Sequence, residues 1–259
     1  MVTEPGRPLG DCARGLSFGS VAESYERYRR GYPDRLVDVV LEFTERPVRR
    51  ALEVGAGTGK ATRTFAGRGI DVTALEPDAQ MAKVLARVTH GLPVRLKAMT
   101  FEQFHSEVRF DLVYAAAAWH WTSPTTRWTH AAELLVPGGV LALFGAPGEL
   151  KDPGLLAAVD EIEKRLLPQD DDVDAHPWSI EEATAAGFDH IEKRELPYVS
   201  TITATDFVGR LGTASLYLKL TPRQRTDTLR EVRKVLPHHF EIDTTLQLSL
   251  ARRVDHWSK

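Results

Sequence analysis

Short apolar runs alternate with amphipathic stretches through the middle of the chain. The apolar runs have the length of buried strands, and apolar residues between them recur at helical spacing. Such alternation is typical of a parallel sheet that is covered by helices on both faces. The pattern predicts strands at 51–54, 71–76, 94–98, 110–115 and 140–145, and helices at 60–68, 79–89 and 124–135.

The pattern changes on both sides of this core. Residues 1–16 are rich in Gly, Pro and Arg, and we expect them to be disordered. Ser20 and Glu23 have the spacing of a capping box, which predicts a helix there, and a second helix is expected at 33–45. The C-terminal part is predicted to hold helices at 155–167, 179–186, 206–218 and 222–236, and strands at 191–201 and 240–252.

Composition narrows the class of protein. The chain has 259 residues, 42% hydrophobic content and a formal net charge of -3, with basic residues scattered, which argues against a nucleic-acid groove. No apolar stretch is long enough to cross a bilayer, and residues 1–6 do not resemble a signal peptide. Cys12 is the only cysteine, so no intrachain disulfide can form. We expect a cytoplasmic protein with no nucleic-acid or membrane partner.

Residues 52–60 combine an apolar strand, a turn with glycine at every second position and the start of a helix. Glycine tolerates left-handed dihedrals and removes the side chains that would block a ligand. A dinucleotide-binding loop would need glycine at Lys60 or Thr62, and a phosphate-binding loop would need it at Val54. The remaining interpretation is a loop for a nucleoside ligand without a pyrophosphate. Its glycines are Gly55, Gly57 and Gly59.

Glu76 stands at the end of the second expected strand and is followed by Pro77 and Asp78. In nucleotide-binding α/β sheets an acidic residue at this place accepts hydrogen bonds from ribose hydroxyls. The alternative is that Glu76 and Asp78 only cap the next helix, a role that we expect for Asp78. Because the glycine loop independently calls for such a group, we predict Glu76 as the ribose ligand.

Further motifs follow in order along the chain, at 17–33, 52–60, 75–81, 110–113 with 119–121, and 135–139. On these motifs the chain resembles the class I S-adenosylmethionine-dependent methyltransferases, in the small-molecule subgroup (methyltransferase type 11) that includes trans-aconitate methyltransferase. The resemblance implies a Rossmann-like α/β fold with a mostly parallel seven-stranded sheet and helices on both faces. It also implies an N-terminal helical cap, a C-terminal helical insertion, and S-adenosylmethionine as the cofactor.

On this resemblance, residues 17–259 are expected to form a single methyltransferase domain, as a monomer or a homodimer. Its expected parts are a helical cap at 17–46, a cofactor-binding half at 47–150, and substrate-side helices and edge strands at 151–259. Families of this kind often use such a C-terminal insertion, together with the N-terminal helix, as a lid over the substrate.

The resemblance also implies a set of cofactor-binding residues. Thr100 stands where the family usually carries an aspartate that accepts from adenine, and a hydroxyl accepts more weakly. Met81 and Phe101 would lie near adenine, with core packing as the alternative, whereas Asp111 lies at the opposite end of its strand and is expected to be structural. Arg29 would pair with the cofactor carboxylate or lie at the surface. The expected set is Tyr25, Arg29, Glu53, Gly55, Gly57, Gly59, Glu76, Pro77, Met81, Thr100, Phe101, Glu102, Ala115 and Ala116.

His120 is the candidate catalytic residue, because it follows the fourth strand and imidazole titrates near neutral pH. The alternative is a wall residue between Trp119 and Trp121. These two tryptophans are expected to line the substrate, with core packing as their alternative, and Trp128 is expected in the core. Positioning alone can supply ~7–11 kcal/mol, and a carboxylate or amine acceptor would need no base.

The expected function is transfer of a methyl group from S-adenosylmethionine to an O, N or C atom of a small organic molecule, by in-line displacement. The alternatives are a fold repurposed for non-methylating chemistry and a non-catalytic cofactor-binding protein. No metal is expected, because the aspartates of 170–174 resemble a solvated loop and His238 and His239 are adjacent. DNA modification is not expected, since neither a cysteine nor an Asp/Asn-Pro-Pro-aromatic sequence follows the fourth strand.

Overall fold

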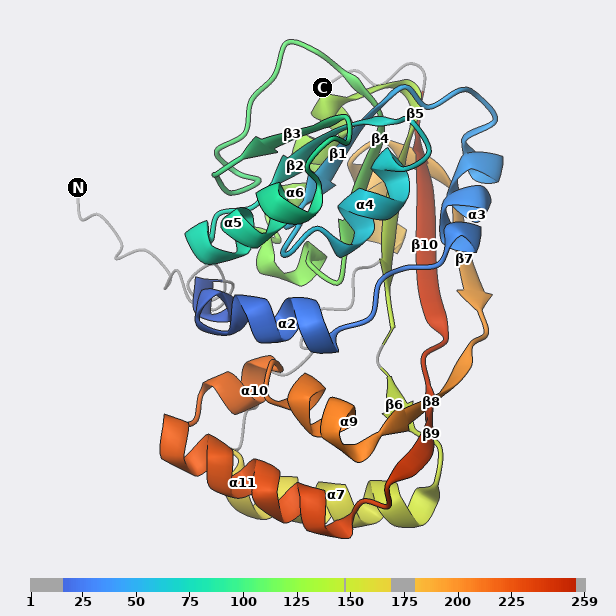
Figure 1. Cartoon of the computed structure of the whole chain (residues 1–259). Helices are drawn as coiled ribbons and strands as arrows, with labels where there is room; N and C mark the ends of the chain where they lie inside the picture. The colour runs from blue at the N-terminus through green and yellow to red at the C-terminus, as the bar shows by residue number, and fades with distance from the viewer. Residues whose placement is uncertain (1–15, 147, 169–179, 255–259) are drawn as a thin grey trace, which may run out of the picture.

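The computed structural model describes residues 16–146, 148–168 and 180–254 (Figure 1). Within them the main feature is a seven-stranded sheet of order β3-β2-β1-β4-β5-β10-β7. The first five of these pair in parallel, whereas β10 pairs antiparallel with both β5 and β7. The predicted mostly parallel, Rossmann-like sheet is therefore confirmed. Its strands are β1 (Arg50–Val54), β2 (Asp71–Leu75), β3 (Val94–Lys97), β4 (Phe110–Ala116), β5 (Leu135–Gly145), β7 (Phe188–Leu196) and β10 (Leu246–Arg253).

Helices cover both faces of this sheet, because its strands bury alternate residues on each side. Leu36, Phe65 and Leu85 bring three helices into the core of one face. Trp128 and Ala183 belong to the core of the other face. On the first face lie α3 (Asp34–Thr44), α4 (Lys60–Ala66) and α5 (Ala79–Val88), and on the second lie η2 (Trp119–Trp121), α6 (Arg127–Leu134) and α8 (Ile180–Ala185).

A second sheet, three-stranded and antiparallel with order β6-β9-β8, lies apart from the first at the lower end of Figure 1. It builds a separate apolar core with helices of the C-terminal half, in which Ile202, Phe207 and Ile242 are buried. The sequence pattern did not predict this sheet. Its elements are β6 (Glu149–Leu150), β8 (Val199–Thr203) and β9 (His239–Asp243), with α7 (Pro153–Leu166), α9 (Ala204–Leu211), α10 (Ser215–Leu218) and α11 (Pro222–Val235) nearby.

The two expected edge strands, 191–201 and 240–252, are each divided between the two sheets. The first becomes β7 and β8, and the second becomes β9 and β10. Pro197 lies at the first break and has no N–H for a sheet ladder. At the crossing, the carbonyl of Tyr198 accepts from the backbone N–H of Thr244 at 2.8 Å. The alternation of polar and apolar residues continues through both breaks, which is why periodicity alone predicted single strands.

The N-terminal segment lies between the two sheets (Figure 1). It consists of a 3-10 turn, η1 (Leu16–Val21), and the helix α2 (Ala22–Tyr28). The capping box expected from Ser20 is wrong: Val21 holds the N-cap position, and no side chain caps the helix. Ser20 belongs instead to the preceding 3-10 turn, η1.

Contacts on both sides fix α2 in this place. On the side of the main sheet, Glu26 accepts from Arg63 Nη1 at 2.7 Å, and its backbone carbonyl accepts from Lys60 Nζ at 2.6 Å. On the other side the ring of Tyr28 lies against Gly209, where an added Cβ would be 2.7 Å from the ring. Helix α2 therefore connects α4 with α9.

Candidate functional site

Two cavities open at the carboxyl ends of β1, β2 and β4, and they meet at the glycine loop. The smaller has a volume of about 130 Å3 and the larger about 520 Å3. Parallel strands end at one edge of the sheet, so this is where a ligand site is expected in an open α/β fold. The residues that line both cavities are Tyr25, Gly55, Gly57, Ala116 and Ala117.

The three glycines of the loop serve different purposes, although all have positive φ, at 65°, 58° and 86°. An added Cβ at Gly55 would lie 2.7 Å from the Cβ of Ala118, and one at Gly59 would lie 2.5 Å from Leu85 Cδ1. Both glycines are therefore needed for packing. A Cβ at Gly57 would meet nothing within 4 Å. Because Gly57 also lines both cavities, its missing side chain leaves room for a ligand against the backbone.

Glu76 connects the end of β2 with the glycine loop. Its Oε2 accepts from the backbone N–H of Gly57 at 2.7 Å, and its Oε1 accepts from the N–H of Asp78 at 2.8 Å. Burial raises the pKa of Glu76 to about 7. Asp78 caps α5 as predicted, accepting from the N–H of Gln80 and Met81. Each carboxylate oxygen of Glu76 keeps a further lone pair for a ligand in the cavity.

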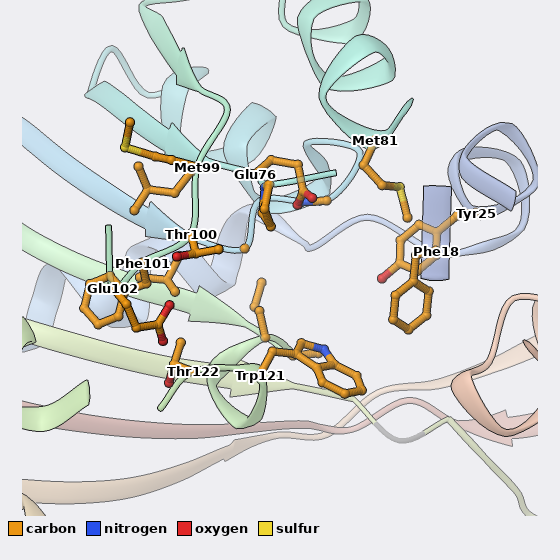
Figure 2. Close-up of a pocket in the computed structure, with 18 residues that line it drawn as sticks. Phe18, Tyr25, Glu76, Met81, Met99, Thr100, Phe101, Glu102, Trp121 and Thr122 are labelled. Carbon is orange, nitrogen blue, oxygen red and sulfur yellow. The ribbon is translucent and has the colours of Figure 1, made fainter. Parts of the chain in front are cut away.

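The smaller cavity gathers most of the predicted cofactor residues around Glu76 (Figure 2). Met81 is only 3% exposed and belongs to an apolar cluster with Tyr25, so it is both core and cavity wall. Phe101 is likewise buried, and its carbonyl lies 3.1 Å from His130 Nε2. The predicted residues brought to this cavity are Tyr25, Gly55, Gly57, Glu76, Pro77, Met81, Thr100, Phe101, Glu102, Ala116 and Trp121.

Aromatic rings from the N-terminal segment complete the smaller cavity. Phe18 packs edge to face against Trp121, with ring centroids 6.0 Å apart, and against Tyr25 at 6.1 Å. Figure 2 shows Phe18 beside Tyr25 at one end of the cavity. Sequence reasoning did not single out Phe18, although it lies in the N-terminal motif at 17–33. The one feature of the sequence that could have pointed to Phe18 is an aromatic residue next to Gly19 within this motif.

Glu53 lines the larger cavity from the end of β1. Its Oε2 accepts from Thr62 Oγ1 at 2.5 Å and from Tyr114 OH at 3.0 Å. Its Oε1 is buried and has no hydrogen-bond partner within the described part of the chain. Burial raises the pKa of Glu53 to about 8. A buried acceptor without a partner is costly, so the site favours a ligand that brings a donor.

Arg29 also lines the larger cavity, where it follows the last residue of α2. Its Nε donates to Thr213 Oγ1 at 2.9 Å and its Nη2 to the Thr213 carbonyl at 3.3 Å. These contacts fix the guanidinium and leave other N–H groups to donate. Arg30 and Arg210 line the same cavity, and sequence reasoning missed both. Arg210 gave no signal, since it belongs to a helix far along the chain.

Four predicted site residues line neither cavity. Gly59 packs against α5, and Ala115 is buried in the sheet. Trp119 is 6% exposed and packs behind the site, with its ring 5.3 Å from that of Trp128. His120 is exposed, and its ring centroid lies 4.3 Å from that of Trp121. The structure therefore brings Trp121 to the site and leaves His120 outside its walls.

Two residues that were expected to be structural are confirmed. Asp111 Oδ2 accepts from the backbone N–H groups of Arg49 and Arg50 at 2.9 and 3.0 Å, at the edge of the sheet opposite the cavities. Trp128 is buried, and its Nε1 donates to Glu182 at 3.0 Å.

The sequence predicts no metal site, on the basis of the aspartates at 170–174 and the adjacent His238 and His239. The aspartates of 170–174 lie outside the described residues. Among the residues that are described, no group of three or more His, Cys, Asp or Glu side chains could hold a metal ion. In the same ranges no helix is long and apolar enough to span a bilayer.

Comparison with known sequences gives a consistent picture. Residues 52–143 match the family model described as a methyltransferase domain. An uncharacterized methyltransferase of Mycobacterium tuberculosis is 30% identical over 242 residues, which cover 92% of this chain and 94% of that protein. A malonyl-[acyl-carrier protein] O-methyltransferase of Enterobacter lignolyticus is 27% identical over 139 residues, covering 52% of this chain and 54% of the relative.

Solved structures share the fold at lower identity. A proposed type II methyltransferase of Anaeromyxobacter dehalogenans superposes with a TM-score of 0.63 at 19% identity, covering 88% of this chain and 100% of that one. A phosphoethanolamine N-methyltransferase of Haemonchus contortus, in complex with S-adenosyl-L-methionine, has a TM-score of 0.55 at 15% identity. That match covers 98% of this chain and 61% of the other.

Proposed function

This chain belongs to the methyltransferase-domain family, and we propose that it transfers a methyl group from S-adenosylmethionine to a small organic acceptor. The observation that carries the proposal is the meeting of two cavities at one glycine loop. One cavity has the groups that a nucleoside needs, and the other has a buried acceptor and a fixed cation beside the same loop. The complex of the Haemonchus enzyme with S-adenosyl-L-methionine supports the choice of donor.

The nucleoside part of the donor fits the smaller cavity. Glu76 would accept from the ribose hydroxyls, because its carboxylate is buried at the end of β2 and already fixed by Gly57. Met81 and Phe101 would contact the purine ring from the cavity walls. Thr100 offers a hydroxyl there in place of a carboxylate, so we expect adenine to be held mainly by shape and apolar contact.

The amino-acid part of the donor fits the near end of the larger cavity. Glu53 has a buried Oε1 that needs a donor, which an ammonium group would supply. Arg29 has guanidinium N–H groups available for a carboxylate. The missing side chain of Gly57 leaves room for the donor to extend from one cavity into the other. With its ammonium group at Glu53 and its carboxylate at Arg29, the amino-acid part of the donor would bind in one orientation.

Methyl transfer from S-adenosylmethionine requires little direct chemical assistance from side chains. S-adenosylmethionine supplies a methyl group that its sulfonium has already activated. The protein has to hold an acceptor in line and exclude water, and such positioning can account for ~7–11 kcal/mol. Phe18, Tyr25 and Trp121 form an aromatic wall of the smaller cavity, which would shield a bound donor from water. The role of His120 as a base stays a prediction, because this residue lines neither cavity.

Two measurements separate methyl transfer from the alternatives. Titration calorimetry with S-adenosylmethionine and S-adenosylhomocysteine should detect binding of both, and Glu76→Ala should abolish it. Incubation with methyl-labelled donor and a cell extract should then place the label in a small product. Binding without labelled product would favour the two alternatives, a repurposed fold or a non-catalytic binding protein. A protein that binds neither compound but does bind a nicotinamide dinucleotide would contradict the proposal.

A further inference from the structure

The larger cavity carries three arginines from two distant parts of the chain. Arg29 and Arg30 follow α2, and Arg210 lies near the end of α9. Among the described residues that line this cavity, Glu53 is the only carboxylate. Cationic side chains therefore outnumber carboxylates in the described lining of the larger cavity.

Two other cations of the lining are neutralised by acids outside the cavity. Lys60 Nζ lies 3.2 Å from Glu26 Oε2, and Arg35 Nη1 lies 3.1 Å from Glu42 Oε1. Arg30, in contrast, donates to the uncharged carbonyl of Thr201 at 3.3 Å. The three arginines Arg29, Arg30 and Arg210 therefore bring their guanidinium groups to one cavity.

Close backbone approaches hold Arg210 in this place. Its Nη1 donates to the carbonyl of Gly148 at 2.8 Å. Gly148 has φ of 68°, and an added Cβ would lie 2.2 Å from the same Nη1, so a side chain here would displace the guanidinium from its present place. Gly209 lets α9 approach the ring of Tyr28, which brings the arginine of α9 toward the two that follow α2.

The like charges are close enough to affect one another. The pKa of Arg210 is lowered to about 10, first by burial and then by repulsion from Arg29 and Arg30. Gathering cations in a partly buried space costs free energy, and an anion bound between them would offset that cost. The guanidinium group matches carboxylate and phosphate oxygens with paired hydrogen bonds.

We propose that Arg30 and Arg210 bind an oxyanion of the methyl acceptor, so that the acceptor is an organic carboxylate or phosphate. Arg29 remains for the carboxylate of the donor. The inference rests on the proposed function, because it places the acceptor in the part of the larger cavity that the donor leaves open. The volume of about 520 Å3 supports two occupants.

The test uses the full chain saturated with S-adenosylhomocysteine, titrated with succinate, inorganic phosphate and the neutral 1,4-butanediol. We expect at least one oxyanion to bind and the diol not to bind. Tighter binding of succinate would indicate a carboxylate acceptor, and tighter binding of phosphate a phosphorylated one. In Arg210→Gln the affinity for the preferred oxyanion should fall by at least about tenfold.

A second test variant and a matched control distinguish loss of the proposed site from a general loss of positive charge. Arg30→Gln removes the charge of an exposed residue and should also weaken oxyanion binding. Arg68→Gln removes the same charge from a residue paired with Asp38, away from both cavities, and should leave the binding unchanged. The inference is overturned, while the proposed function stands, if S-adenosylhomocysteine binds but neither succinate nor phosphate does. The same holds if Arg30→Gln and Arg210→Gln bind the oxyanion as tightly as the wild type does. Failure of the wild-type protein to bind S-adenosylhomocysteine would overturn both this inference and the proposed function.

Discussion

The two cavities that meet at the glycine loop are assembled in different ways. The smaller is lined mainly by residues that follow β1, β2, β3 and β4, so the edge of one parallel sheet brings them together. The larger combines the same loop with the segment after α2 and with residues of α9, β8 and β9. It exists only because the second sheet lies beside α2. The smaller cavity therefore follows mainly from the main sheet, whereas the larger cavity depends on how the two cores are joined.

The largest effect is expected from a side chain added at Gly57, where the two cavities meet. Gly57→Asn adds a side chain where a Cβ meets open cavity space, and asparagine tolerates a positive φ. We expect affinity for S-adenosylhomocysteine to fall by about 100-fold or more, equivalent to about 2.8 kcal/mol. The matched control is Gly69→Asn, at φ of 77° with open space but away from both cavities. Equal losses in the two variants would show that backbone strain, and not the cavity, is responsible.

A second variant removes the charge that connects the loop with β2. Glu76→Gln should weaken binding of the same compound about 10- to 100-fold, because hydrogen bonds to a charged group contribute about 1.5–3 kcal/mol. Asp78→Asn is the control, since asparagine caps a helix as well as aspartate does and Asp78 lines neither cavity. Calorimetry on both variants compares the acid expected to bind the ligand with a helix-capping acid two residues further along the chain.

The acids of the two cavities also predict how stability depends on pH. Burial raises the pKa of Glu53 to about 8 and that of Glu76 to about 7, so between about pH 5 and pH 8 these two groups hold more protons in the folded protein than in the unfolded chain. Stability of the ligand-free protein should therefore fall as the pH rises from about 5 to about 8. Urea unfolding at a series of pH values would measure the slope. Glu53→Gln should flatten its upper part, and an unchanged slope there would contradict the raised pKa.

The smallest effect is expected at His120. Removing a general base lowers the rate about 10²–10⁴-fold, but this ring is exposed and outside both cavities. We expect His120→Ala to change kcat far less than that. Trp121→Ala should raise the KM for the donor, because Trp121 lines the smaller cavity and packs against Phe18. A large fall in kcat for His120→Ala, with an unchanged KM, would support the hypothesis that His120 is a general base.

The same contrast explains what the sequence could predict. The five parallel strands and the glycine loop follow from local patterns, and Glu76 follows because its place is set by the end of a neighbouring strand. Pro197 marks the bend between β7 and β8, yet the alternating pattern continues past it, so the second sheet escaped prediction. Arg210 joins the site through contacts between distant segments, such as that of Gly209 with Tyr28, and no local pattern encodes such a contact.

The most direct test is a crystal structure of the protein with S-adenosylhomocysteine. We expect the purine in the smaller cavity between Met81 and Phe101, the ribose hydroxyls at Glu76, and the ammonium group at the buried oxygen of Glu53. A nucleoside bound elsewhere, or one that leaves Glu76 without a ribose contact, would contradict the assignment of the smaller cavity to the donor.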